Sequence, residues 1–155
     1  AMLFESIRSG DIESVKAQIQ NKPSLVSERD ARGFTPLVLA AYYNLTDVVQ
    51  LLLDNGAEVN AQDAAGNTAL MGCCFKGYIE VVELLIEHGA DINIKNHSQA
   101  TAIIYCASFG QVAVMQVLLE RGADPSLKDD KGKSALDHAK KQGDQSTIEL
   151  LEAHV

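Results

Sequence analysis

Three cysteines, four histidines and scattered carboxylates are the residues of this chain whose chemistry could support catalysis or metal binding. Cysteine and histidine side chains bind zinc when four of them converge at short, regular spacings. The histidines are His88, His97, His138 and His154, and none of them has a cysteine or a second histidine at ligand spacing. We therefore expect no metal site.

Other patterns that support catalysis or cofactor binding do not occur in the sequence. We find no glycine-rich phosphate loop, no serine–histidine–aspartate set and no nucleophile elbow. Acidic residues such as Asp129 and Asp130 are typical of turns, in which they bond their own backbone, and they are too scattered to form a carboxylate pair. The sequence predicts a protein that is not an enzyme and holds no cofactor.

The elements that must position any functional residue follow a repeat of 33 residues. The phased positions are Gly33, Gly66, Gln99 and Gly132; Thr35, Thr68, Thr101 and Ser134; and Leu37, Leu70, Ile103 and Leu136. A fixed period of this size indicates stacked supersecondary units, none of which can bury its apolar face alone. Because such a solenoid offers a long surface instead of a deep pocket, recognition is favoured over catalysis.

One unit shows how local signals predict each element. The segment Asp63–Asn67 has the composition of a turn, and its glycine can take a positive φ. Thr68 follows as the expected N-cap of a short helix over 69–75. Gly77 is expected to end that helix, and a second helix with one apolar side is predicted over 79–87. The unit is therefore a β-turn, a helix, a turn and a helix.

The whole chain is predicted to be one domain, 1–155. Its repeats have the approximate bounds 3–28, 29–62, 63–95, 96–128 and 129–155. The first unit has no preceding turn, and the last carries polar residues at positions that are apolar in inner units, as capping repeats require. Gln99 stands where the other units have the turn glycine, which predicts a reshaped or strained turn in the fourth repeat.

These phased residues resemble the ankyrin repeat, whose pattern is D-x-x-G-x-T-P-L-H-x-A-A-x-x-G followed by L-L-x-x-G-A-D-x-N. The best matches are 30–60 and 63–93, and the resemblance covers nearly the whole chain. It implies an all-α ankyrin-repeat solenoid of stacked helix-turn-helix units, with β-turns that project as fingers. The histidine of the pattern is replaced throughout, and its proline survives only as Pro36. The stretch 66–72 is similar to bacterial members of the family.

The resemblance also implies a binding surface, because family members mostly bind other proteins through the finger tips and the exposed side of the first helices. We call this side of the molecule the concave surface. The matching finger positions are Arg32, Phe34, Asn67, His97, Lys131 and Lys133. The matching first-helix positions are Tyr42, Tyr43, Phe75, Lys76, Ser108, Phe109 and Lys141.

Aromatic residues are concentrated at these positions. The chain has four Tyr, four Phe and no Trp, and the positions just named include five of these eight rings. Aromatic side chains anchor interfaces because they bury a large area at a low rotamer cost. We expect Tyr43, Phe75 and Phe109 to form the hot spot, whereas Tyr105 is assigned to the core. The alternative is that some of these rings fold back over the helices and serve packing.

The cysteines are interpreted as small core residues. Cys73 and Cys106 occupy equivalent positions, where the family places alanine, and Cys74 lies beside the first. Equivalent positions on stacked helices lie roughly 8–10 Å apart, whereas a disulfide needs Cα atoms within about 7 Å. Free thiols are therefore expected, which fits a reducing compartment.

Charge and hydropathy exclude two classes of partner. The net charge of −8 argues against nucleic acid, which requires a basic face. No run of about 18 apolar residues and no signal peptide occurs, which predicts a cytoplasmic protein that binds no membrane, with a removed export signal as the alternative.

The segment Asp47–Asp91 holds eight acids and one base, and 128–141 holds five bases and three acids. This gradient either steers a charged partner or reflects ordinary solvated faces.

The sequence thus predicts a monomeric module that binds another protein over the concave surface, as an adaptor, a scaffold or an inhibitor. One alternative is a self-associating assembly protein in which the aromatic positions pair two copies of the chain. A second alternative, which the resemblance adds, is an accessory protein to a bacterial stress enzyme.

Overall fold

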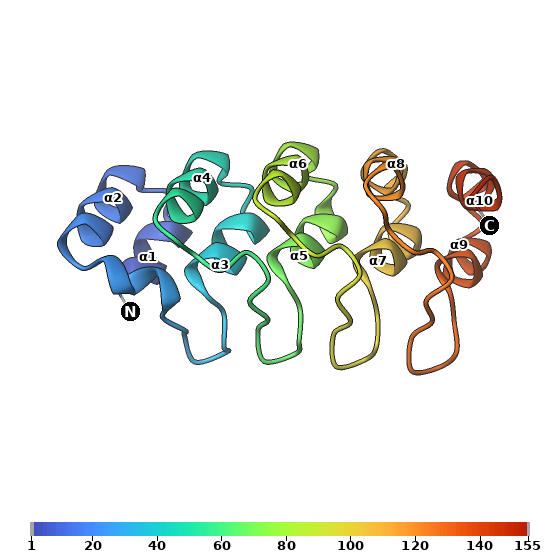
Figure 1. Cartoon of the computed structure of the whole chain (residues 1–155), viewed down its shortest axis with the longest axis horizontal. Coiled ribbons are helices and arrows are strands. Elements are labelled where there is room, and N and C mark those ends of the chain that lie inside the picture. The colour runs from blue at the N-terminus through green and yellow to red at the C-terminus, as the bar shows by residue number, and fades with distance from the viewer. Residues whose placement is uncertain (1, 155) are drawn as a thin grey trace.

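The computed structural model describes residues 2–154, and in this range ten α-helices form five stacked pairs (Figure 1). The first helices of the pairs are α1 (Met2–Arg8), α3 (Pro36–Tyr42), α5 (Ala69–Lys76), α7 (Ala102–Ser108) and α9 (Ala135–Gln142). The second helices are α2 (Ile12–Asn21), α4 (Thr46–Asp54), α6 (Ile79–Glu87), α8 (Val112–Glu120) and α10 (Gln145–Glu152). A 3-10 helix, η1 (Pro23–Ser27), follows α2.

Figure 1 shows the first helices in one layer and the second helices in another, with four long turns projecting beyond the first layer. This arrangement confirms the predicted all-α solenoid with fingers. The second helix predicted over 79–87 has these bounds, and the helix predicted over 69–75 is one residue longer. Neighbouring first helices pack on one another along the whole stack, so each repeat supports the next.

Most first helices begin at the residue that the sequence predicts as the N-cap. The hydroxyl of Thr68 accepts a hydrogen bond from the backbone N–H of Met71 at 3.3 Å, and Thr35 caps α3 in the same way. Ser134 forms a capping box with Asp137. Each of these bonds satisfies a backbone donor that the first turn of a helix leaves free.

Thr101 is the exception among these caps. It occupies the N-cap position of α7, yet its hydroxyl oxygen is buried and has no hydrogen-bond partner among the described residues. The expectation that the fourth repeat follows the same capping plan is therefore wrong at this residue. The helix is supported by packing, because α7 lies against both α5 and α9.

The core runs without interruption between the two helix layers. Large side chains fill it, and small residues on the first helices let neighbouring repeats approach closely. The fully buried large residues include Leu37, Leu52, Met71, Leu85, Ile103, Met115 and Leu118. The fully buried small residues on α3, α5 and α7 include Ala40, Ala41, Ala69, Cys73, Cys74, Ala102, Cys106 and Ala107.

Each finger is built on one Asp or Asn side chain at its base. The Oδ1 atom of this residue accepts hydrogen bonds from the backbone N–H groups two and four positions further along the chain. The base residues are Asp30, Asp63, Asn96 and Asp129. The fourth residue of each turn also donates its N–H to the carbonyl of the base residue, in the left-handed conformation.

Gln99 takes this left-handed position without being a glycine. Its φ is 59°, and its N–H bonds the carbonyl of Asn96 at 2.9 Å, as the glycines do in the other fingers. The fourth-repeat turn is therefore strained and keeps the common shape. The side-chain Cβ of a non-glycine residue in this conformation costs roughly 1–2 kcal/mol.

We expect Gln99→Gly to raise the free energy of unfolding by about 0.5–1 kcal/mol, because glycine removes this strain but loses more backbone entropy on folding. Urea unfolding followed by circular dichroism measures the change. Ser98→Gly at the neighbouring exposed position is the control, and we expect it to give no gain. Equal gains from both variants would contradict the assignment of strain to Gln99.

Candidate protein-binding surface

The structure places the thirteen residues predicted for the concave surface on the fingers and on the first helices or their C-terminal ends. Nine of them are exposed: Arg32, Tyr42, Tyr43, Lys76, His97, Phe109, Lys131, Lys133 and Lys141. Four are half-buried: Phe34, Asn67, Phe75 and Ser108.

The aromatic rings form two contact groups on this surface. The rings of Tyr42 and Tyr43 meet edge to face, with centroids 5.9 Å apart. The ring of Phe75 lies against Tyr105 at 4.5 Å and against Phe109 at 5.1 Å. Tyr42, Tyr43 and Phe109 are 45%, 44% and 53% exposed, whereas Phe75 is half-buried. Phe75 therefore contributes to packing and also lines the surface.

Tyr105 packs against the core, as expected, but the core does not enclose it fully. The residue is half-buried, its ring lies against Phe75, and its hydroxyl accepts a hydrogen bond from the Asn96 side-chain amide at 2.5 Å. Burial raises the pKa of Tyr105, because it disfavours the charged phenolate. A tyrosine hydroxyl needs a polar partner, and the base of the fourth-repeat finger supplies one.

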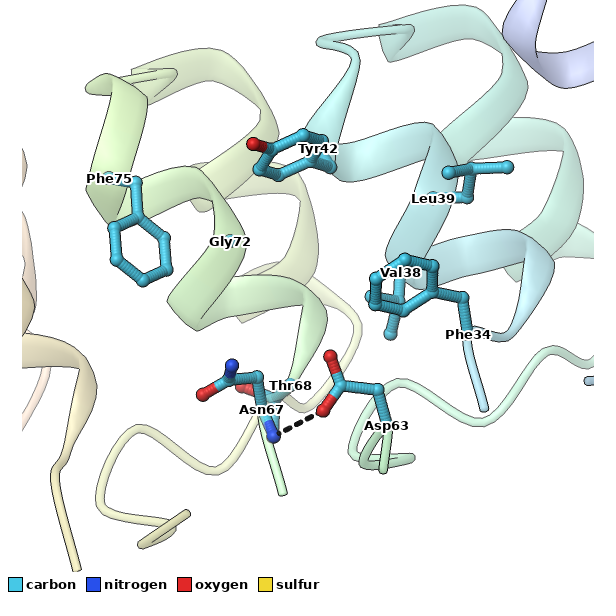
Figure 2. Close-up of a pocket in the computed structure, with 9 residues that line it drawn as sticks. All are labelled: Phe34, Val38, Leu39, Tyr42, Asp63, Asn67, Thr68, Gly72 and Phe75. Atoms are coloured by element: carbon cyan, nitrogen blue, oxygen red, sulfur yellow. Dashed lines mark hydrogen bonds between the residues drawn. The ribbon is translucent and has the colours of Figure 1, made fainter. Parts of the chain in front are cut away.

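A hollow of about 170 Å³ opens on the concave surface between the second and third repeats (Figure 2). Its lining is mostly apolar and comes from α3, from Phe34 just before this helix, from α5 and from the base of the third-repeat finger. The lining residues are Phe34, Val38, Leu39, Tyr42, Asp63, Asn67, Thr68, Gly72 and Phe75. A pocket with apolar walls and a few polar groups is the usual form of a recognition site.

Two further hollows adjoin this one. The hollow on the N-terminal side, of about 350 Å³, shares Phe34 and Tyr42 with it and adds Arg8, Arg32 and Tyr43. The hollow on the C-terminal side, of about 290 Å³, shares Tyr42 and Phe75 with it and adds Lys76 and Phe109. The three hollows together form one groove, which we call the aromatic groove. It crosses α3 and α5 and reaches the C-terminal ends of α1 and α7.

Basic side chains line the edges of the aromatic groove. The Nζ atom of Lys76 lies 5.5 Å from the centroid of the Tyr42 ring, within the range of a cation–π interaction. Arg8 pairs with Asp30 at 3.3 Å. Both cations are on exposed side chains, so these contacts add little to the free energy of unfolding. They do show that an aromatic ring and a carboxylate of this surface can each contact a cation.

The three cysteine thiols lie together in the core and are free. Burial is the main cause that raises the pKa of Cys73 to about 12, and the nearby Cys106 raises it further. The pKa of Cys74 is also raised, first by a hydrogen bond with Cys106 and then by burial. Cys73 is the residue equivalent to Cys106 in the repeat, but it is for Cys74 that Cys106 is the first cause of the raised pKa.

We expect the folded protein to be inert to a thiol reagent such as 5,5′-dithiobis(2-nitrobenzoic acid) at pH 8. A pKa of about 12 leaves about one Cys73 thiol in ten thousand ionised at that pH, and all three side chains are buried. In guanidinium chloride all three thiols should react, which the absorbance of the released thionitrobenzoate measures. Fast reaction of any thiol in the folded state would contradict this prediction.

The described residues also bear on metal and membrane binding. Between residues 2 and 154, no three His, Cys, Asp or Glu side chains gather in a group that could hold a metal ion. None of the helices over this range has the length and the apolar composition that crossing a bilayer requires.

Comparison with known proteins decides the family. The family model described as "Ankyrin repeats (3 copies)" matches residues 3–96, and a second model, "Ankyrin repeats (many copies)", matches residues 85–139. The chain belongs to the ankyrin repeat family. Ankyrin repeats generally mediate protein–protein interaction.

Curated relatives match over short segments. The chain is 40% identical over 55 residues to "BTB/POZ domain-containing protein 3" of Schizosaccharomyces pombe, a match that covers 36% of this chain and 10% of that protein. It is 36% identical over 59 residues to the human "Ankyrin repeat domain-containing protein 35", covering 38% of this chain and 6% of that protein. The matches therefore span a tenth or less of these relatives. The similarity to bacterial family members stays a prediction.

Proposed function

We propose that this ankyrin repeat protein is a non-enzymatic adaptor, scaffold or inhibitor in the cytoplasm, and that it binds one partner protein along the aromatic groove. The observation that carries this proposal is the continuity of the groove. Tyr42 lines all three of its hollows and Phe75 lines two, so one extended partner segment could contact α3, α5 and the end of α7 together.

The exposure of the aromatic rings supports this proposal. Tyr42, Tyr43 and Phe109 are large rings that the fold leaves about half exposed, and contiguous apolar patches on a protein surface usually mark binding sites. Aromatic anchors in pockets carry most of the energy of typical interfaces. The described lining of the aromatic groove includes one carboxylate, Asp63, and no pair of nucleophile and base, so this surface is better suited to recognition than to catalysis.

The experiment compares three baits in partner capture from a lysate of the source organism. The parent is compared with the triple variant Tyr43→Ala, Phe75→Ala, Phe109→Ala. The control bait is Ile79→Ala, which removes an exposed apolar side chain from the layer of second helices. Circular dichroism first establishes that all baits keep their helicity.

We expect the parent and the Ile79→Ala bait to retain a protein that the triple variant loses. With that partner purified, calorimetry should show that each aromatic deletion costs about 1–3 kcal/mol of binding free energy, or roughly 5- to 150-fold in Kd. Unchanged binding after all three deletions would show that the partner binds elsewhere, for example at the finger tips or the basic C-terminal repeat.

The same baits test the self-association alternative. We expect the parent to sediment as a monomer in dilute solution. A mass twice that of one chain for the parent, and of one chain for the triple variant, would instead favour pairing of two copies through the aromatic groove.

A further inference from the structure

Each Asp or Asn at a finger base has a second side-chain polar atom besides the Oδ1 that holds the turn. In the fourth repeat this atom is Nδ2 of Asn96, which bonds the hydroxyl of Tyr105 at 2.5 Å. In the fifth repeat it is Oδ2 of Asp129, which accepts a hydrogen bond from Nε2 of His138 at 2.8 Å. Both partners come nine positions after the base residue, from the first helix that follows the finger.

The third repeat lacks this partner. The residue nine positions after Asp63 is Gly72, which has no side chain. Over the described part of the chain, Oδ2 of Asp63 has neither a hydrogen-bond nor an ion-pair partner, whereas Oδ2 of Asp30 in the second repeat pairs with Arg8. Asp63 is thus the base residue whose second polar atom is left for a ligand.

The space that a side chain at position 72 would enter is the hollow of about 170 Å³ described above. We call this hollow the Gly72 pocket. Figure 2 shows one oxygen of Asp63 bonded to the backbone of Asn67 and the other turned toward Phe34 and Val38, on the inside of the pocket. The rings of Phe34, Tyr42 and Phe75 stand around the same space. A carboxylate oxygen among ring faces attracts a cation, through both its charge and the ring quadrupoles.

We propose that the Gly72 pocket binds the side chain of a lysine of the partner protein, with the ammonium group on Oδ2 of Asp63 and the aliphatic stem along the rings. This inference rests on the proposed function, because it names the residue type that the partner inserts into the aromatic groove. Asp63 is the one carboxylate among the described residues that line the aromatic groove, and its negative charge is complementary to an ammonium group.

The geometry of Asp63 favours lysine over arginine. Its Oδ1 already accepts two hydrogen bonds, from the backbone N–H groups of Ala65 and Asn67, both at 2.9 Å. A guanidinium group is best bound by two carboxylate oxygens side by side, whereas an ammonium group is a compact charge that a single oxygen can bind. The long apolar stem of lysine also matches the apolar walls of the pocket.

The test is a titration of the ¹⁵N-labelled full chain with four small probes, followed by NMR. The probes are the N-acetyl N-methylamides of lysine, norleucine, arginine and glutamate. Norleucine has the lysine stem without the charge, and glutamate has the opposite charge. We expect lysine to give saturable shifts at Gly72, Asn67 and Phe75, arginine weaker ones, and norleucine and glutamate none at these residues.

Two variants separate the pocket from the fold. Asp63→Asn should keep the finger, because Asn96 forms the same turn in the next repeat. It should weaken lysine binding about tenfold or more, because it removes a charged hydrogen bond. Gly72→Tyr should fill the pocket as Tyr105 does one repeat later, and abolish the shifts. Gly72 lies within α5, and a Cβ added there would meet the Tyr42 side chain at 3.9 Å, an ordinary van der Waals contact.

The proposal is overturned if the lysine probe gives no saturable shift at these residues, if norleucine or glutamate shifts them equally, or if Asp63→Asn binds lysine as well as the parent does. None of these results touches the proposed function, which the aromatic triple variant tests separately. A partner that Asp63→Asn retains and the triple variant loses would confirm the aromatic groove as the binding surface and reject the lysine pocket.

Discussion

Replacing Ile103 with alanine should lower the free energy of unfolding by about 2–5 kcal/mol. Ile103 is fully buried in α7, and this helix packs between α5 and α9. The lost methyl and methylene groups leave a cavity, and helices held on both sides cannot move in to fill it. Because each repeat is stable only through its neighbours, a defect in a central repeat weakens the whole stack.

Leu136→Ala is the matched control for this prediction. Leu136 occupies the equivalent position of α9, but it is half-buried, because none of the described helices covers the outer side of the last repeat. We expect its deletion to cost about half as much, in proportion to the smaller apolar area removed from water. Urea unfolding of the two variants measures both losses. Equal losses would contradict the view that the central repeats carry most of the stability.

Replacing Gly66 with alanine should cost at least about 2 kcal/mol of unfolding free energy, from two causes. Gly66 has a φ of 82°, which alone disfavours a residue with a Cβ. The new Cβ would also lie 2.7 Å from the backbone nitrogen of His97 and 3.0 Å from Cα of Asn96. The N–H of His97 bonds the carbonyl of Ala65 at 3.0 Å, so the clash would break a contact that joins two fingers.

Gly132→Ala separates the two causes. Gly132 has a φ of 71° in the equivalent turn, but a Cβ there would meet nothing within 4 Å. We expect a loss of about 1 kcal/mol, the conformational cost alone. Thermal unfolding measures the difference between the variants, and ¹⁵N NMR should show shifts at both adjoining fingers in Gly66→Ala only. A loss no larger for Gly66→Ala than for Gly132→Ala would show that the fingers are not packed as described.

The repeat period, the helix bounds and the finger turns follow from the chain alone, because their signals are local. The turn glycines, the Thr and Ser caps and the apolar spacing each act within a few residues, and each recurs at 33-residue steps. The resemblance to the ankyrin repeat, carried over by position, implied the thirteen candidate residues, and they lie on the fingers and on the first helices or their C-terminal ends. The binding role of these residues stays a proposal.

Contacts between repeats were decided by the tertiary structure, because they depend on which side chains fill the space between neighbouring units. Periodicity alone does not predict that Cys106 raises the pKa of Cys74, that the Tyr105 hydroxyl bonds Asn96, or that the Thr101 hydroxyl lacks a capping bond. Gly72 is the clearest case. In the sequence it is one small residue in a short helix, and only when the repeats are stacked does its missing side chain leave Asp63 facing an aromatic pocket.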